Sequence, residues 1–268
     1  RDKKLDTTEV IYMRSMTNGE YVIGKTLGNM QVFMILNIAV LGMALIFNLV
    51  SPGTYVSWWS YLLYLLLISI PTLVFIMGLS FLLMSLIRNQ AVTFVIILGY
   101  IGLTLFLIQD AYYYVFDYMA FNIPMLRSGI TGFGNLAVIL GHRGIYFFLG
   151  AGFIFLTIFL LKRLPQSESM TWASVVLSVV FIAAGAWLAF SHVYRFVSND
   201  RLRAHAIELN NHYASGPVAD VVTHALQVQH LGQSIAVTST MTLVNNNRQP
   251  IDTLVFALNP GLEVSMAR

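Results

Sequence analysis

Four histidines in the last part of the chain are the residues whose type comes nearest to a metal site: His205, His212, His224 and His230. Neutral imidazole is the commonest metal ligand in proteins, but the spacing opposes a shared ion. His224 and His230 would lie about 20 Å apart along a strand. His205 and His212 would lie about 10 Å apart along a helix. We therefore expect surface histidines, and neither a metal nor another cofactor held by this chain.

Other reactive motifs are missing from the sequence. The chain has no cysteine, which removes thiolate nucleophiles and thiolate metal ligands. It contains no His-Glu-x-x-His pair, and Gly19–Lys25 lacks the spacing of a phosphate-binding loop. Asp110 and Asp117 lie in an aromatic segment, where we expect an interfacial rather than a catalytic role. The chain is therefore not expected to be an enzyme by itself.

The composition points to a membrane. Of the 268 residues, 57% are hydrophobic and 10% are charged, against about 45–50% and about 25% in an ordinary globular protein. A soluble fold of this size could not hide so much apolar surface. The net charge of +3 comes from 15 basic and 12 acidic residues, which gives no footprint for nucleic acid. A soluble enzyme, a nucleic-acid binder and a disordered chain are all disfavoured.

Five apolar runs have about the 17–25 residues that a membrane-spanning helix needs. The second contains Pro71, so we expect it to tilt or kink. No charge lies inside any run, which argues against a proton-coupled antiporter and a voltage sensor. The runs are residues 30–50, 56–87, 91–108, 144–161 and 170–190.

Six polar residues interrupt the first two runs. Hydrogen bonding between helices is the role we expect for them, and lining a substrate path is the alternative. They are Asn37, Asn48, Ser69, Thr72, Ser80 and Ser85.

The segments beside the spans give an orientation. Residues 1–29 are polar and amphipathic, which predicts one or two short helices at a membrane surface. Residues 109–143 are too aromatic and glycine-rich for a free loop, so we expect external re-entrant or interfacial structure. Lysine and arginine concentrate in the segments that share a side with residues 1–29, which places this side in the cytoplasm.

Residues 191–268 are more polar and look like the start of an incomplete extracytoplasmic β domain. Apolar and polar residues alternate in Ala219–Leu231, Ser234–Asn245 and Thr253–Leu258, and a turn signal follows at Asn245–Asn247. Since the chain begins at Arg1 and ends within a strand-like pattern, we interpret it as a fragment of a longer protein.

The segment Asp6–Gly28 resembles the cytoplasmic part of type-2 ABC transporter permeases, with Glu20, Gly24 and Lys25 matching the end of the family's motif. In that family three spans, a pair of short external helices and a further span follow, which is the order found here. The resemblance implies two spans upstream of Arg1 and an additional last span. It also implies a cytosolic ABC ATPase that carries the ATP, a homodimer of permease halves in the lipid bilayer, and residence in a bacterial inner membrane. The ATPase-coupling residues that it implies are Glu9, Tyr12, Arg14, Glu20, Gly24 and Lys25.

The tail resembles the first β domain of aminopeptidase N-like zinc metallopeptidases over Ile235–Val264. This resemblance implies that any zinc site would lie beyond Arg268.

The function expected from the sequence is therefore the membrane-spanning permease of an ATP-driven exporter. Two alternatives stay open: a membrane-anchored zinc aminopeptidase whose catalytic part lies downstream, and a structural or sensory membrane protein. The fold expected is all-α and polytopic, with five transmembrane helices followed by the β-rich segment.

Overall fold

The computed structural model describes residues 17–51, 56–125, 127–128, 132–161, 168–214, 216–231, 234–256, 258 and 262–265. The chain divides into two compact units, Arg1–Val197 and Ser198–Arg268. Each unit is described by itself.

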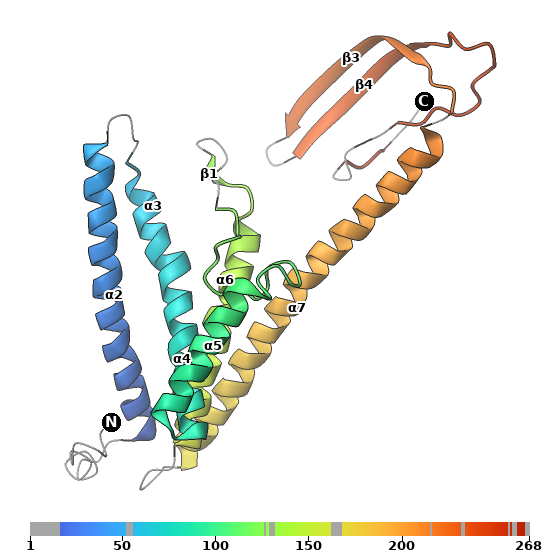
Figure 1. Cartoon of the computed structure of the whole chain (residues 1–268). Coiled ribbons are helices and arrows are strands. Elements are labelled where there is room, and N and C mark those ends of the chain that lie inside the picture. The colour runs from blue at the N-terminus through green and yellow to red at the C-terminus, as the bar shows by residue number, and fades with distance from the viewer. Residues whose placement is uncertain are drawn as a thin grey trace. The chain divides into compact units, whose positions relative to one another are not determined.

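The first unit is helical (Figure 1). Helices α3 and α4 and the π-helix η2 between them form one continuous rod, and α7 continues into the second unit. Two very short strands, β1 and β2, pair between α5 and α6. The elements are α2 (Asn18–Val50), α3 (Trp58–Leu63), η2 (Tyr64–Ser69), α4 (Ile70–Ile87), α5 (Gln90–Phe106), β1 (Arg127–Ser128), β2 (Gly132–Phe133), α6 (Leu136–Leu160) and α7 (Glu168–Tyr213).

Among the described residues, four helices rather than five are long and apolar enough to cross a membrane: Asn18–Val50, Trp58–Ile87, Leu136–Leu160 and Glu168–Tyr213. The prediction of long apolar helices is confirmed, but the count differs. The segment predicted as the third span, residues 91–108, forms α5, an apolar helix of only 17 residues.

Several helix ends also differ from the prediction, because hydrogen bonds rather than hydropathy fix them. Thr17 and Glu20 form a capping box that starts α2 at Asn18, so residues 18–29 continue the first long helix and do not form a separate surface helix. Helix α6 starts at Leu136, which removes residues 136–143 from the predicted loop. Residues 191–213 continue α7 and do not begin the β domain.

Glycines bring α4, α6 and α7 close together. A Cβ atom on Gly150 of α6 would lie 2.6 Å from the Cα of Phe75 on α4, and a Cβ on Gly152 would lie 2.6 Å from the Cγ1 of Ile182 on α7. On the same side of α6, Phe155 stacks on Phe181 of α7, with ring centroids 5.6 Å apart. These contacts make α6 the central helix of the unit.

Helix α2 is joined to the other helices by an apolar contact of Val22 with Val74, Ile154 and Ile158 and by polar side chains. The Nδ2 of Asn18 donates to the Leu161 carbonyl at 3.0 Å, and the Ser69 hydroxyl donates to the Oδ1 of Asn37 at 3.0 Å. Near the other end of α2, Asn48 donates to the Tyr61 hydroxyl at 2.7 Å. Interhelical hydrogen bonding is thus confirmed for Asn37, Asn48 and Ser69.

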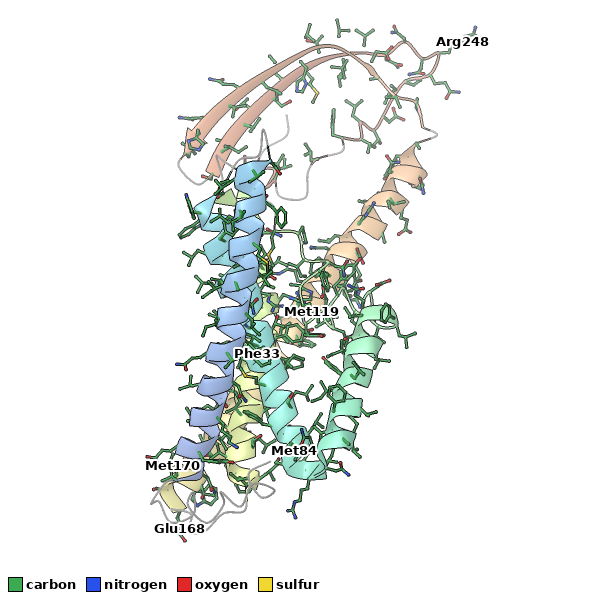
Figure 2. The ribbon with its side chains drawn as sticks, turned by 60° about the vertical axis from the view of Figure 1, so that its left-hand side comes forward. Phe33, Met84, Met119, Glu168, Met170 and Arg248 are labelled. Atoms are coloured by element: carbon green, nitrogen blue, oxygen red, sulfur yellow. The ribbon has the colours of Figure 1, made fainter. Side chains whose placement is uncertain are left out.

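Helix α4 finishes and helix α7 begins at the same end of the unit. Figure 2 shows Met84, Glu168 and Met170 near the end of the unit where α4 finishes and α7 begins. Of the other polar residues predicted to join helices, Ser80 and Ser85 donate to carbonyls of their own helix, those of Ile76 and Leu82.

The second unit holds an antiparallel hairpin of β3 (Asp220–Leu231) and β4 (Ser234–Val244). These strands fall on the first two predicted alternating segments. The predicted turn is also present, because the Asn247 amide donates to the Oδ1 of Asn245 at 2.9 Å. The third predicted strand is wrong over its described residues, 253–256 and 258, which have no regular secondary structure.

The close approach of α4 and α6 predicts that Gly150→Ala destabilises the protein. The added methyl group meets the backbone of Phe75, and overpacking of this kind costs about 1–3 kcal/mol. The thermal unfolding midpoint in detergent measures the loss. Gly99→Ala on α5 is the matched control, because no atom lies within 4 Å of its added Cβ. Equal midpoints for the two variants would contradict the packing argument.

Candidate functional site: a buried polar cluster

Among the described residues, the structure buries one arginine near the start of α6. Arg143 on α6 is 2% exposed, and its guanidinium donates to four acceptors. Its Nε donates to the Leu67 carbonyl at 2.7 Å, and its Nη1 donates to the Tyr118 carbonyl at 2.9 Å. Its Nη2 donates to the Ile68 carbonyl at 3.2 Å and to the Thr72 hydroxyl at 2.7 Å. The charge is therefore surrounded by backbone and hydroxyl oxygens.

The local sequence of the second long helix explains why those oxygens are available. Pro71 has no amide hydrogen, so the Leu67 carbonyl four residues earlier loses its helical donor. The π-helix immediately before Pro71 shifts the pattern further, since the Ile70 amide donates to Leu65, five residues back. Carbonyls released in this way inside a membrane helix need another donor. Arg143 supplies it.

A loop after α5 forms the other side of the cluster. We call residues 107–122 the tyrosine loop. Its backbone carbonyls meet side chains of two helices: His142 on α6 bonds through Nε2 to the Tyr114 carbonyl at 3.1 Å, and His192 on α7 bonds through Nε2 to the Tyr113 carbonyl at 3.0 Å. The Tyr146 hydroxyl donates to the Val115 carbonyl. These bonds attach the loop to α6 and α7.

The Thr72 hydroxyl on α4 donates to the Tyr118 carbonyl at 3.1 Å, so α4 also holds the loop. The Tyr118 ring packs against the rings of Phe75, Tyr100 and Tyr146. Burial, together with the neighbouring Asp117 carboxylate, raises the pKa of the Tyr118 hydroxyl. That hydroxyl consequently stays protonated around neutral pH.

Three consecutive residues of the loop have left-handed backbone: Tyr112, Tyr113 and Tyr114, with φ of 51°, 60° and 64°. This conformation costs a non-glycine residue about 1–2 kcal/mol. The cost is offset where surrounding contacts fix the backbone, as the bonds to the carbonyls of Tyr113 and Tyr114 do here.

The buried carboxylate of the loop, Asp117, is hydrogen-bonded locally. Asp117 is 3% exposed, and its Oδ2 accepts from the Asn122 amide at 2.7 Å. Two buried polar atoms among the described side chains have no hydrogen-bond partner: the Tyr118 hydroxyl and the Nδ1 of His142. Thr72, His142, Arg143 and His192 thus bind backbone oxygens and join α4, α6 and α7 to the tyrosine loop. We call this group of residues the clamp.

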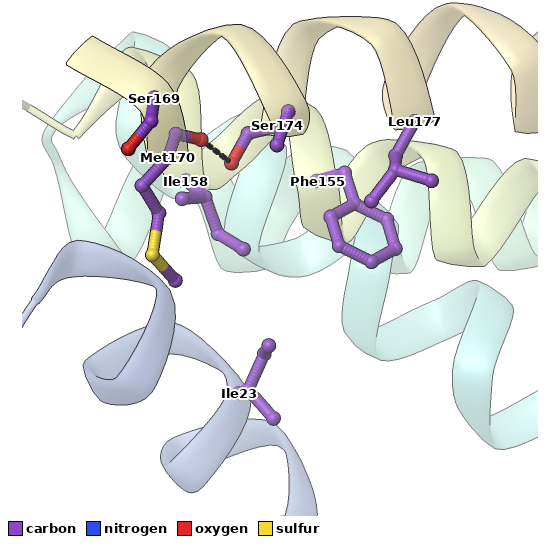
Figure 3. A pocket seen from close by; sticks show the side chains of 8 residues that line it. Ile23, Phe155, Ile158, Ser169, Met170, Ser174 and Leu177 are labelled. Carbon is purple, nitrogen blue, oxygen red and sulfur yellow. Dashed lines mark hydrogen bonds between the residues drawn. The ribbon is translucent and has the colours of Figure 1, made fainter. Parts of the chain in front are cut away.

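A second feature is an apolar cavity of about 360 Å³ between α2, α6 and α7 (Figure 3). Ile23 of α2 and Met170 of α7 point toward each other across it, and Phe155 and Ile158 of α6 also line it, with Ser169, Ala173, Ser174 and Leu177 of α7. The nearby Ser174 hydroxyl is already used, since it donates to the Met170 carbonyl at 2.8 Å. This cavity suits a hydrocarbon group.

The structure places three of the six predicted coupling residues together. Glu20, Gly24 and Lys25 are exposed on the first two turns of α2. The Oε2 of Glu20 accepts from the Thr17 amide at 2.7 Å, and the Nζ of Lys25 lies 4.7 Å from the centre of the Tyr21 ring. The other three, Glu9, Tyr12 and Arg14, lie outside the described residues.

The four tail histidines are exposed, as predicted. His224 bonds to the Ser239 hydroxyl at 2.8 Å, and the Nδ1 of His205 lies 3.8 Å from the carboxylate of Glu208.

The expectation that no charge lies inside a span is wrong for α6, because Arg143 belongs to that helix. Sequence reasoning missed His142, Arg143 and His192, which the structure brings together from two helices. One available signal was the polar pair His142-Arg143 directly before an apolar run.

Four long apolar helices and a buried arginine clamp define a helical protein of the membrane type. No protein-family model matches the chain, and no curated protein or solved structure matches it either.

The clamp predicts that Arg143→Met lowers stability strongly. Methionine keeps an unbranched apolar stem but removes the donor to the carbonyls of Leu67 and Ile68 and one of the two donors to the Tyr118 carbonyl. We expect a loss of about 2–5 kcal/mol, measured as a lower unfolding midpoint in detergent. Arg195→Met is the control, because Arg195 is an exposed arginine of α7. Equal unfolding midpoints for Arg143→Met and Arg195→Met would contradict the stabilising role of Arg143.

Proposed function

We propose that the chain is the membrane-spanning permease part of an ATP-driven exporter in a bacterial inner membrane. A cytosolic ATPase subunit binds the ATP, and two permease halves form the transport path. The order of elements supports this proposal: long apolar helices, an aromatic loop between α5 and α6, and a further long helix. It is the order that the resemblance to type-2 ABC permeases implies.

One observation carries the proposal. The exposed residues Glu20, Gly24 and Lys25 stand on the same uninterrupted 33-residue helix that runs from Asn18 to Val50. A rigid helix transmits a push at its end along its whole length, as ATP-driven switching requires. The Thr17–Glu20 capping box fixes the first turn, so a force applied there is not lost by fraying.

The cargo proposed is apolar or lipid-like. The described helices carry few charges, and Arg143 is enclosed by oxygens rather than open to a polar substrate. The cavity beside α2 is lined mainly by apolar side chains.

The hairpin supports a second candidate, a membrane-anchored metallopeptidase. Strand β4 lies almost wholly in the segment that resembles the first β domain of aminopeptidase N-like enzymes, β3 precedes that segment, and almost all residues of both strands are exposed. A two-stranded hairpin is only marginally stable alone, so these strands suit a larger sheet. Zinc content and peptidase activity of the full-length protein test this candidate.

The coupling proposal predicts that Glu20→Gln combined with Lys25→Gln reduces association with the ATPase. Glutamine keeps an oxygen for the capping bond to Thr17, so the helix start is retained while both charges are lost. We expect several-fold less ABC ATPase to co-purify, with ATP hydrolysis by the purified complex falling in parallel.

Glu168→Gln is the control for this experiment, because Glu168 is an exposed acid in the first turn of α7. If the double variant retains as much ATPase as the control, the coupling role of this face is wrong. A complex with no ABC ATPase at all would favour the structural or sensory alternative.

The proposed orientation predicts that Lys25 and Gln227 face opposite sides of the membrane. Because the chain has no cysteine, Lys25→Cys and Gln227→Cys each introduce a single thiol at an exposed position. In intact cells a membrane-impermeant maleimide should label Gln227→Cys and label Lys25→Cys only after lysis. Labelling of both from the same side would overturn the orientation.

A further inference from the structure

We propose that the tyrosine loop is a strained latch, which stays docked only while α4, α6 and α7 keep their present spacing. The latch closes when side chains of the three helices bind its backbone, and it releases when the helices separate. As a control of the proposed exporter it rests on the proposed function, but the latch itself does not.

The docked state depends on donors from three separate helices. Thr72 comes from α4, His142, Arg143 and Tyr146 come from α6, and His192 comes from α7. All of them bind carbonyl oxygens of the loop, so they fix its backbone and not merely its side chains. Any shift of one helix against another therefore removes part of the attachment.

Ring contacts also attach different parts of the loop to different helices. The Tyr113 ring stacks on Phe196 of α7, with centroids 5.4 Å apart and an angle of 16° between the rings. The Tyr118 ring lies 6.0 Å from Phe75 of α4 and 6.4 Å from Tyr146 of α6. Separation of α7 from α4 and α6 would pull the two rings of the loop apart.

Strain supplies the tendency to release. Tyr112, Tyr113 and Tyr114 are held at positive φ, where a residue with a Cβ atom is disfavoured. The backbone hydrogen bonds inside the loop are those of turns, such as the bond from the Asp117 amide to the Tyr114 carbonyl at 3.0 Å. Once the helices let go, the tyrosines return to the favoured backbone region and the docked shape is lost.

The same helices carry the proposed transport movement. Opening of a path between helices at this end of the unit would release the loop, and closing would dock it again. The loop would thus couple the spacing of α4, α6 and α7 to access at the end of the unit opposite Glu20 and Lys25.

A single thiol in the loop tests the latch. Met119 packs against the buried cluster of Phe75, Tyr118 and Tyr146, so Met119→Cys should react slowly with maleimide while the loop is docked. In this background we compare Tyr112→Gly with Tyr112→Val. Tyr112 is 67% exposed, so both changes act mainly through the backbone.

The strained latch predicts opposite effects for the two variants. Glycine accepts positive φ, so Tyr112→Gly should slow labelling about fivefold, while the β-branched valine should speed it several-fold. An ordinary flexible loop would instead be loosened by glycine. Faster labelling with Tyr112→Gly, or equal rates for the two variants, would overturn the proposal.

A second variant tests the attachment to α7. His192→Phe keeps an aromatic ring beside Phe196 but removes the donor to the Tyr113 carbonyl, so labelling of the thiol should become faster. His205→Phe, an exposed position of α7, is the control and should leave the rate unchanged. If His192→Phe also leaves it unchanged, the α7 attachment is wrong.

These measurements need neither an ATPase nor ATP. The latch can therefore succeed while the coupling experiment on Glu20 and Lys25 fails, or the reverse, and the two proposals are judged apart.

Discussion

The guanidinium of Arg143 is the interaction on which the helical unit depends. It binds the Leu67 carbonyl, whose α-helical donor is lost at Pro71, and it binds the Ile68 carbonyl and the tyrosine loop at the same time. A buried cation is costly unless oxygens surround it, and free carbonyls in an apolar interior are costly unless donors reach them. Each feature removes the cost of the other. Losing either one would leave the opposite group unsatisfied.

This exchange requires α4 and α6 to lie close together, which the glycine contacts allow. Gly150 brings α6 against the backbone of Phe75 on α4, and the clamp forms one and two turns further along α6, toward its start. Helix α2 is attached differently. In its most apolar stretch none of α2 is buried, against 44% of α6. Of the four long helices, the one that carries Glu20, Gly24 and Lys25 thus has the least buried apolar stretch. A push on it can be transmitted without first breaking the clamp.

Hydropathy was sufficient to predict the long helices, because an apolar run of that length has few other stable forms in a membrane. It could not place their ends. A run ends at its first charge, so the prediction stopped at Gly144 and assigned Arg143 to the loop. The acceptors that keep Arg143 inside the helix lie 75 and 76 residues away along the chain, and no local pattern reveals them.

The two buried histidines also form contacts that no local sequence pattern reveals. His142 and His192 were not linked, since their common feature is a bond to the backbone of Tyr114 and Tyr113, and backbone carbonyls leave no mark on a sequence. The alternation in Thr253–Leu258 failed for a related reason. Alternation describes the faces of a strand but does not supply a neighbour, and over its described residues this segment has no ladder.

The short length of α5 places the tyrosine loop beside the residues of the clamp. Helix α5 ends at Phe106, and the carbonyl of Leu103 accepts from the amides of both Leu107 and Ile108. The chain then turns at once into the left-handed tyrosines. Arg143 lies about 26 Å along α6 from the Leu160 end of that helix, and it binds the loop there. Since a bilayer core is about 30 Å thick, the loop docks close to where a spanning helix would leave the lipid. Extending α5 by another turn would carry the loop backbone past the donors of His142, Arg143 and His192. The 17-residue helix is therefore the length that lets the loop reach its clamp.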